Sequence, residues 1–254
     1  ACARGDGRLA TICYRGGEIV FAENEVVVDA GVELMALIEA AMSRGLGGIE
    51  TLSGIPGTVG GAVVGNAAAY GQTIGARVLE VTAYDPLREK ELILPAAACR
   101  FGYRDSAFKH EQQHLVLLRI RLRLEEKSET TLRTKSEEIL AVRSKKYPPG
   151  LKTPGSFFKN LLREELPAEV QAALPPLSDY YGKVPAWYFL NQVGARGMKH
   201  GGLEIADFHG NYMINRGNAT YAEVRALAAE LKDRVWQKFH VQLEEEVRYL
   251  EPAH

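Results

Sequence analysis

Cysteine is scarce in this chain of 254 residues, which contains only Cys2, Cys13 and Cys99. An odd number of widely separated cysteines argues against a disulfide framework, and their spacing matches no metal-binding motif. The simplest setting for such a chain is a reducing compartment, the cytoplasm. Isolated cysteines usually serve as small core residues, so a redox role for any of the three is the less favoured interpretation.

The sequence also lacks an excess of either charge and any long apolar run. The 31 lysines and arginines nearly balance the 32 aspartates and glutamates, which gives a formal net charge of −1. Without a basic stripe, nucleic acid is not expected as a partner, and no apolar run is long enough to cross a bilayer. Residues 1–8 lack the apolar core of a signal peptide. The composition predicts a globular protein of one large domain or two smaller ones.

Strand and helix patterns follow one another without regular alternation. Strands are predicted at 9–14, 18–22, 25–30, 77–84, 90–94, 115–124 and 241–250. Helices are predicted at 32–43, 132–145 and 222–239. Because hairpins predominate over strand–helix–strand units, the pattern favours an α+β fold over a doubly wound parallel sheet.

Three of these segments carry more specific expectations. Alternation in 115–124 predicts a buried face made of Val116, Leu118, Ile120, Leu122 and Leu124, with three arginines turned to water. Thr220 and Glu223 form a capping box ahead of the last helix. The polar stretch 126–134 predicts a boundary between two domains.

Glycine is concentrated in the segment 54–62, GIPGTVGGA. Four glycines in eight residues let backbone N–H groups approach a large anionic group such as a pyrophosphate. The segment matches neither the GxGxxG fingerprint nor a P-loop, since no GK[ST] follows. The alternative interpretation is a tight turn between packed elements.

Three other segments contain candidate functional side chains. In 101–106, FGYRDS, Arg104 beside Tyr103 is suited to clamp a carboxylate, although a surface salt bridge is the commoner use. In 155–160, GSFFKN, the Ser156 hydroxyl is a candidate proton donor, and no GxSxG elbow points to acyl transfer. In 243–248, LEEEVR, a carboxyl group in a cleft would act as a general acid, whereas three adjacent glutamates usually form a solvated face. His209, alone between apparent strand ends, is more often structural.

Taken together, these segments resemble one family over most of the chain, from about Gly45 to Leu250. The matching run is GIPGTVGGAV, NAAAYG, FGYRDSAFK, KYP, GSFFKN, GGLEIADFHGNYMINRGNAT and LEEEVR. In order and spacing it resembles the UDP-N-acetylenolpyruvoylglucosamine reductases. The resemblance implies an oxidoreductase that uses FAD and NADPH to reduce the enolpyruvyl ether of a UDP-sugar to UDP-N-acetylmuramate, in peptidoglycan synthesis.

The resemblance also implies the organisation of the molecule. Residues 1–127 would be the remnant of an FAD-binding domain of the vanillyl-alcohol-oxidase type, and residues 128–254 the substrate-binding domain. The partners would be the UDP-sugar substrate and NADPH, with neither nucleic acid nor membrane, and the chain would act as a cytoplasmic monomer.

Roles for single residues follow from the same resemblance. Arg104 matches the family's active-site arginine, Ser156 matches the serine that protonates the substrate, and Glu246 matches the catalytic glutamate. The substrate-binding positions are matched by Tyr103, Lys146, Lys159, Asn160 and His209. The flavin site is matched by Gly54, Ile55, Pro56, Gly57, Thr58, Gly60 and Gly61.

The sequence departs from the family pattern in several places. No GSN-type pyrophosphate loop precedes Gly45, so we expect the N-terminal part of the flavin-binding domain to be missing. Asn66-Ala67 replaces the usual asparagine–glycine pair, and 161–184 reads as an insertion. This insertion is either a lid over the substrate or, as the favoured interpretation, a neutral surface excursion, because long loops cost little. With no tyrosine-bearing loop between Arg104 and Ser156, the chain resembles the shorter subtype.

Two other functions remain open at this point. One is a flavin-free fragment that binds a UDP-sugar without reducing it. The other is a different flavin oxidoreductase of the same fold.

Overall fold

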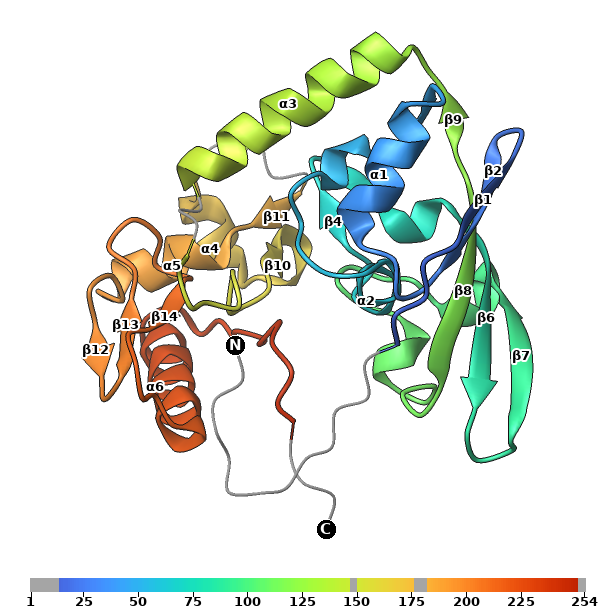
Figure 1. Cartoon of the computed structure of the whole chain (residues 1–254). Coiled ribbons are helices and arrows are strands. Elements are labelled where there is room, and N and C mark those ends of the chain that lie inside the picture. Colours follow the sequence, from blue (N-terminus) through green and yellow to red (C-terminus); the bar gives the residue numbers. More distant parts are fainter. Residues whose placement is uncertain (1–13, 147–149, 176–181, 251–254) are drawn as a thin grey trace. The chain divides into compact units, whose positions relative to one another are not determined.

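The computed structural model describes residues 14–146, 150–175 and 182–250, which form two compact units (Figure 1). The N-terminal unit holds the described residues up to 146, and the C-terminal unit holds those from 150 onward. Each unit has its own hydrophobic core. Antiparallel sheets combined with helices in both units confirm the expected α+β fold. Among the described residues, no helix is long and apolar enough to span a membrane.

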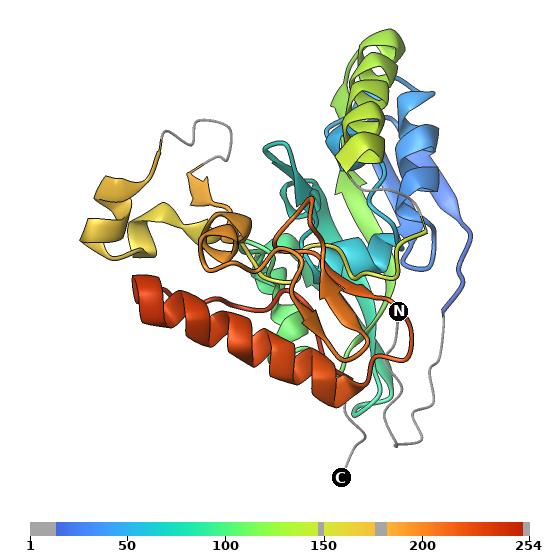
Figure 2. The same ribbon diagram turned by 90° about the vertical axis from the view of Figure 1, so that its left-hand side faces the viewer.

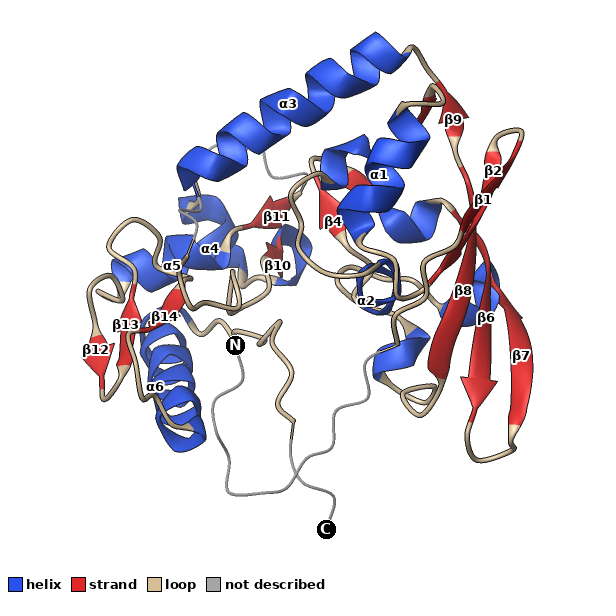
Figure 3. Cartoon of the chain, in the orientation of Figure 1, coloured by secondary structure: helices blue, strands red, loops and turns tan. Residues whose placement is uncertain are grey.

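The N-terminal unit is built on a five-stranded antiparallel sheet (Figure 3). In sheet order its strands are β1 (Ile19–Ala22), β2 (Glu25–Asp29), β8 (Val116–Arg123), β6 (Val78–Asp85) and β7 (Lys90–Pro95). Helix α2 (Val59–Val64) packs against β2 and β8, and α1 (Leu34–Met42) packs against α2. The predictions for 18–30, 32–43, 77–94 and 115–124 are therefore confirmed as elements. The part of the predicted strand 9–14 before residue 14 lies outside the described residues.

Shorter elements complete this unit. They are the strand pairs β3 (Leu46–Gly47) with β9 (Glu125–Glu126) and β4 (Ala68–Ala69) with β5 (Gln72–Thr73), and the 3-10 turns Glu50–Leu52, Ile74–Ala76, Ala96–Cys99 and Ala107–Lys109.

A register shift interrupts the alternation predicted for 115–124. Ile120 is fully buried as expected, but Val116 is 46% exposed and Leu117 is buried in its place. The pairing of β6 with β8 shifts between Thr82 and Ala83. An extra residue at such a bulge moves the neighbouring side chains to the opposite face, so the expectation for Val116 was wrong.

Helix α3 (Glu129–Lys146) belongs to the N-terminal unit rather than to the unit that follows it. Leu132 is buried in the N-terminal core, and the hydroxyls of Ser136 and Ser53 are 2.7 Å apart. Arg143 donates from Nη2 to the carbonyl oxygen of Gly54 at 3.0 Å. The units therefore divide after α3, some twenty residues beyond the division expected at 127–128, because the polar outer face of α3 hides these inward contacts from the sequence pattern.

The C-terminal unit pairs a small antiparallel sheet with a long helix. The sheet consists of β12 (Lys199–His200), β13 (Leu203–Ile205) and β14 (Met213–Asn215), and α6 (Tyr221–Phe239) runs alongside it (Figures 1 and 2). The predicted capping box is confirmed, since Thr220 Oγ1 accepts the N–H of Glu223 and the Glu223 carboxylate accepts the N–H of Thr220. The buried face of α6 includes Leu227, Leu231 and Val235.

The stretch 161–184 is partly built into this unit. It contains β10 (Leu161–Leu162), the 3-10 turn Arg163–Glu165, α4 (Ala168–Ala173) and β11 (Lys183–Val184), and α5 (Ala186–Gln192) follows it. Leu166, Val170 and Leu174 are buried in the C-terminal core. The stretch is therefore more than a surface excursion, because its apolar side chains help to form that core.

The closing strand predicted at 241–250 is not formed as a regular strand. This segment makes a single β-bridge, between Glu245 and Phe158, flanked by two backbone hydrogen bonds. The apolar alternation of Val241 and Leu243 is real, since both side chains are buried, but a full ladder requires a longer partner strand.

Candidate functional site

The glycine-rich segment 54–61 forms a loop that leads into α2. Gly54 and Gly57 have φ angles of +75° and +118°, backbone conformations that glycine adopts readily. Thr58 is the N-cap of α2, and its hydroxyl accepts the N–H of Gly61 at 3.2 Å. A Cβ added to Gly57 would meet no atom within 4 Å, so the backbone there is open to an approaching group.

Both interpretations of this loop find support, at different residues. A Cβ on Gly60 would lie 2.9 Å from the Cβ of Ala30, and the Gly60 N–H donates to the Ala30 carbonyl oxygen at 2.8 Å. Gly60 is therefore a packing glycine that lets α2 approach the end of β2. Gly57 and Thr58, by contrast, present exposed or half-buried polar backbone that fits a large anionic cofactor.

Arg104 lies in a tight turn held against the other end of α2. The backbones of Gly102 and Asp105 form a β-bridge around it, and Arg104 itself has a φ of +54°. Ser106 is buried, and its hydroxyl donates to the carbonyl oxygen of Val64 at 2.7 Å. At about 1.5 Å per residue the six residues of α2 make a helix roughly 9 Å long, and the Arg104 turn and the glycine loop contact its opposite ends.

Asn66 ties this turn to the segment that follows α2. It is buried, with a φ of +43°, and its Nδ2 donates to the carbonyl oxygen of Gly102 at 2.6 Å. Its Oδ1 accepts the N–H of Gly75 at 3.0 Å. In the sequence, Asn66 stands out only as a departure from the family's asparagine–glycine pair, and no local pattern indicates that it fixes the Arg104 turn.

In the C-terminal unit, Ser156 begins a short extended segment with partners on both sides. Ser156 forms a β-bridge with Tyr212, and the Phe157 N–H donates to the Asn211 carbonyl oxygen at 2.9 Å. On the opposite edge, the Glu246 N–H donates to the Phe157 carbonyl oxygen at 2.8 Å. The chain thus places Ser156 and Glu246, 90 positions apart in sequence, on directly bonded neighbouring segments.

The three glutamates 244, 245 and 246 have different surroundings. Glu244 is exposed and forms an ion pair with Lys159, while Glu245 is mostly buried and forms one with Lys232 of α6. Together with burial, Glu245 also raises the pKa of the Tyr249 hydroxyl above its ordinary value, burial being the larger cause. Glu246 is half-buried. Only Glu244 is exposed to solvent, so the three glutamates do not form a uniformly solvated face.

The other substrate-binding candidates have identifiable local roles. His209 is buried, and its Nδ1 accepts the N–H of Asn211 at 3.3 Å, which leaves Nε2 as the protonated nitrogen of the neutral ring. The Asn160 side-chain oxygen accepts the N–H of Ala186, the first residue of α5. Lys146 is the last residue of α3.

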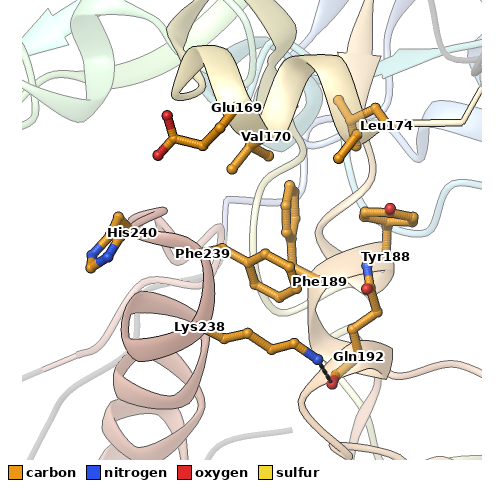
Figure 4. Close-up of a pocket in the computed structure, with 10 residues that line it drawn as sticks. Glu169, Val170, Leu174, Tyr188, Phe189, Gln192, Lys238, Phe239 and His240 are labelled. Atoms are coloured by element: carbon orange, nitrogen blue, oxygen red, sulfur yellow. Dashed lines mark hydrogen bonds between the residues drawn. The ribbon is translucent and has the colours of Figure 1, made fainter.

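A cavity of about 320 Å³ lies elsewhere in the C-terminal unit, between α4, α5 and the end of α6 (Figure 4). Aromatic rings of Tyr188, Phe189 and Phe239 form its walls, and Lys238 at its rim donates to the carbonyl oxygen of Gln192 at 2.9 Å. None of the predicted site residues lines it. Among the described residues, no group of three or more His, Cys, Asp or Glu side chains is arranged to hold a metal ion.

The predicted site residues are thus distributed over both units. The N-terminal unit contains the glycine loop, Tyr103, Arg104 and Lys146, and the C-terminal unit contains Ser156, Lys159, Asn160, His209 and Glu246. Within the C-terminal unit, one bonded arrangement joins the segments of Ser156, His209 and Glu246. Asn211, at its centre, was missed because an isolated asparagine has no distinctive spacing.

Comparison with known proteins identifies the two parts of the chain. Residues 15–87 match the model of an FAD binding domain, and residues 147–250 match that of the UDP-N-acetylenolpyruvoylglucosamine reductase C-terminal domain. The first match confirms the expected flavin-binding domain and its FAD cofactor at the level of the family.

Full-length relatives and a solved structure agree with these matches. The reductase of that name from Solibacter usitatus is 43% identical over 244 residues, covering 93% of this chain and 77% of the relative. The one from Pseudomonas aeruginosa is 35% identical over 252 residues, covering 87% and 73%. The crystal structure of the Thermus caldophilus reductase superposes with a TM-score of 0.67 at 28% identity, covering 87% of this chain and 71% of that one. The expected oxidoreductase class is confirmed with them: this chain belongs to the UDP-N-acetylenolpyruvoylglucosamine reductase family.

Proposed function

We propose that this chain reduces the enolpyruvyl ether of UDP-N-acetylglucosamine enolpyruvate to UDP-N-acetylmuramate, with bound FAD and with NADPH as the reductant. In this proposal it acts in peptidoglycan synthesis, as a cytoplasmic monomer. The observation that supports it most directly is the backbone bond between Glu246 and Phe157, which places two residues matching the family's catalytic positions, Ser156 and Glu246, on adjacent segments.

The N-terminal unit is the proposed flavin-binding lobe. The residues that would hold FAD are those of the glycine loop, where Gly57 offers open backbone and Thr58 caps α2. When bound and reduced, FAD supplies a hydride to the terminal carbon of the vinyl ether. The task left to the protein is to bind the substrate, to stabilise the charge that develops on it and to deliver a proton.

Arg104 and Glu246 are the proposed stabilising groups. Hydride addition leaves carbanion or enolate character at the carbon that bears the substrate carboxylate. A guanidinium and a protonated carboxylic acid both donate hydrogen bonds to such charge, and losing one such donor typically costs on the order of 3 kcal/mol in the barrier. The turn that fixes Arg104 is held by Ser106 and Asn66, so the guanidinium starts from a defined backbone position.

Ser156 is the proposed proton donor. Its hydroxyl transfers a proton to the carbon next to the carboxylate, completing the saturated lactyl ether. Because a hydroxyl is a weak acid in water, this transfer requires assistance from a charged neighbour or a water chain. Tyr103, Lys146, Lys159, Asn160 and His209 are proposed to bind the nucleotide-sugar, with His209 donating from Nε2.

One experiment tests this proposal against its alternatives. The purified chain is examined for the visible absorption bands of flavin, and NADPH consumption is then followed with UDP-N-acetylglucosamine enolpyruvate. Substrate-dependent consumption by a yellow protein supports the proposal. Substrate binding without flavin absorbance would establish the flavin-free fragment instead. Flavin absorbance with turnover of a different substrate, unaffected by Ser156→Ala, would establish another oxidoreductase of the same fold.

A further inference from the structure

Asn211 is a buried asparagine, and both polar atoms of its side chain bond to the backbone of one residue. It lies between β13 and β14 and is 2% exposed. Its Oδ1 accepts the Phe158 N–H at 2.9 Å, and its Nδ2 donates to the Phe158 carbonyl oxygen at 2.8 Å. The amide thus bonds to Phe158 as the backbone of a neighbouring strand would.

The backbone of Asn211 adds a third bond to the same segment, since its carbonyl oxygen accepts the Phe157 N–H at 2.9 Å. On the other edge of the segment, Phe157 and Lys159 bond to Glu246 and Glu244, each at 2.8 Å. Asn211 and the glutamate segment therefore grip 157–159 from opposite sides. Any slip of this segment would move Ser156 relative to Glu246.

The Asn211 side chain bonds to Phe158 in place of a backbone strand because the chain makes a turn at this point. The Tyr212 N–H donates to the His209 carbonyl oxygen at 2.9 Å, which closes a turn around Asn211. Phe158 is 1% exposed as a whole residue, so its backbone N–H and carbonyl oxygen are shielded from water. A buried N–H or carbonyl group left without a partner is costly, so the amide of Asn211 supplies both partners.

We propose that Asn211 is a positioning residue for the reaction: by clamping the backbone of Phe158, it sets the place of the Ser156 hydroxyl relative to Glu246. The inference rests on the proposed function, because it assumes that Ser156 donates the proton. Proton transfer is sensitive to distance, and a displacement of about 1 Å typically costs on the order of a hundredfold in rate. Asn211 does not touch the substrate in this scheme and acts through the segment it holds.

The test separates the two halves of the catalytic cycle in the full chain loaded with FAD. Reduction of the enzyme by NADPH alone does not involve Ser156, whereas reoxidation by UDP-N-acetylglucosamine enolpyruvate does. Asn211→Ala is expected to slow reoxidation by roughly 10- to 100-fold and to leave reduction within about twofold of the wild type. Substrate affinity, measured by calorimetry on the oxidised protein, is expected to change far less than the reoxidation rate.

Asn211→Asp is a second variant with a side chain of nearly the same shape. The pH dependence of its reoxidation rate reports specifically on the two hydrogen bonds to Phe158. Its ionised carboxylate still accepts the Phe158 N–H but repels the Phe158 carbonyl oxygen, while the protonated acid donates to that oxygen. Reoxidation by this variant is therefore expected to recover towards the wild-type rate as the pH is lowered. If Asn211→Ala fails to fold, Asn211→Asp tests the proposal instead. Its melting temperature shows whether the variant is folded, and the pH profile of its reoxidation rate tests the positioning role.

Asn215→Ala is the matched control. Asn215 is the last residue of β14, and its side chain accepts the N–H groups of Gly217 and Ala219 in the following loop rather than bonding to the 156–159 segment. It is expected to lower the melting temperature without a selective effect on reoxidation. The inference is overturned if folded Asn211→Ala is reoxidised at the wild-type rate, or if both half-reactions slow in parallel. Failure of the wild-type chain to be reoxidised by this substrate would instead overturn the proposed function.

Discussion

Asn66 and Gly102, 36 residues apart, are joined by a hydrogen bond of 2.6 Å from the asparagine Nδ2 to the glycine carbonyl oxygen. The other side-chain atom of Asn66 accepts the N–H of Gly75, so one buried amide connects three segments of the N-terminal unit. One of these segments contains Arg104, whose turn begins at Gly102. The placement of the proposed active-site arginine therefore depends on a residue outside its own motif.

Asn66→Ala is expected to destabilise the N-terminal unit by about 1–3 kcal/mol, because it removes two part-buried hydrogen bonds that contribute roughly 0.5–1.5 kcal/mol each. Urea unfolding measures this loss. Asn66→Asp is the matched control for backbone conformation, since aspartate also tolerates the φ of +43° and keeps the acceptor for Gly75. A smaller loss in Asn66→Asp than in Asn66→Ala is expected, and equal stability of Asn66→Ala and wild type would contradict the role assigned to this bond.

Glu50 makes the stability of the N-terminal unit dependent on pH. It is 5% exposed, and its carboxylate accepts the Gly48 N–H at 2.5 Å and the Gln72 amide at 3.2 Å. Burial alone raises the pKa of Glu50, but these hydrogen bonds and the Lys127 ammonium hold it below its ordinary value. A depressed folded-state pKa contributes stability above the unfolded pKa, about 4.3, and loses it as the pH falls through the folded value.

Glu50→Gln is therefore expected to be less stable than the wild type at pH 7, by roughly 1–3 kcal/mol. The difference should shrink as the pH is lowered below about 4, where the wild-type carboxyl becomes protonated. Urea unfolding across this range measures it. Glu39→Gln, which removes an exposed ion pair with Arg133, is the control and should leave the free energy of unfolding almost unchanged at every pH. A pH-independent difference for Glu50→Gln would refute the interpretation.

Local patterns were sufficient to predict most of the large elements. The strands of the five-stranded sheet, α1 and the capping box of α6 follow from apolar spacing and from residues within one helical turn. The features that could not be predicted depend on partners distant in sequence. The bulge that exposes Val116 arises in the pairing of β6 with β8, and the place of α3 depends on the contact of Ser136 with Ser53.

In the candidate site, too, residue types could be predicted from local motifs, but their spatial arrangement could not. The family-like motifs identified Ser156 and Glu246, yet their proximity depends on backbone bonds across 90 positions that no spacing predicts. Asn211 bonds to Phe158, 53 residues away, and Glu244 and Glu245 differ in exposure and in their ion-pair partners, Lys159 and Lys232. The chemistry of the site could be read from residue types, whereas its geometry required the fold.

Cys99 is expected to be unreactive in the folded chain. Its side chain is fully buried, and burial raises the pKa of its thiol to about 11. Since only the thiolate reacts rapidly with disulfide reagents, a Cys2→Ser, Cys13→Ser variant should label slowly at pH 8 and rapidly once unfolded in urea. Rapid labelling of the native variant would show that Cys99 is accessible and would reopen a redox role for it.

Ser156→Ala removes the proposed proton donor without removing any of the backbone bonds that hold its segment. General acids typically accelerate the step they serve by 10²–10⁴-fold, so reoxidation of the reduced enzyme by UDP-N-acetylglucosamine enolpyruvate should fall by roughly that factor. Reduction by NADPH, flavin content and melting temperature should stay near their wild-type values, because the bonds from Phe157 to Asn211 and Glu246 use main-chain atoms.

Ser144→Ala serves as the control for this substitution. Ser144 lies on α3, where its hydroxyl only donates back to the Ala141 carbonyl oxygen, and its loss should affect neither half-reaction. Stopped-flow absorbance of the flavin bands follows both steps in one instrument. Selective loss of reoxidation in Ser156→Ala would assign the proton to this hydroxyl. An unchanged reoxidation rate would mean that another group, such as a water molecule, delivers the proton, and the assignment of Ser156 would have to be abandoned.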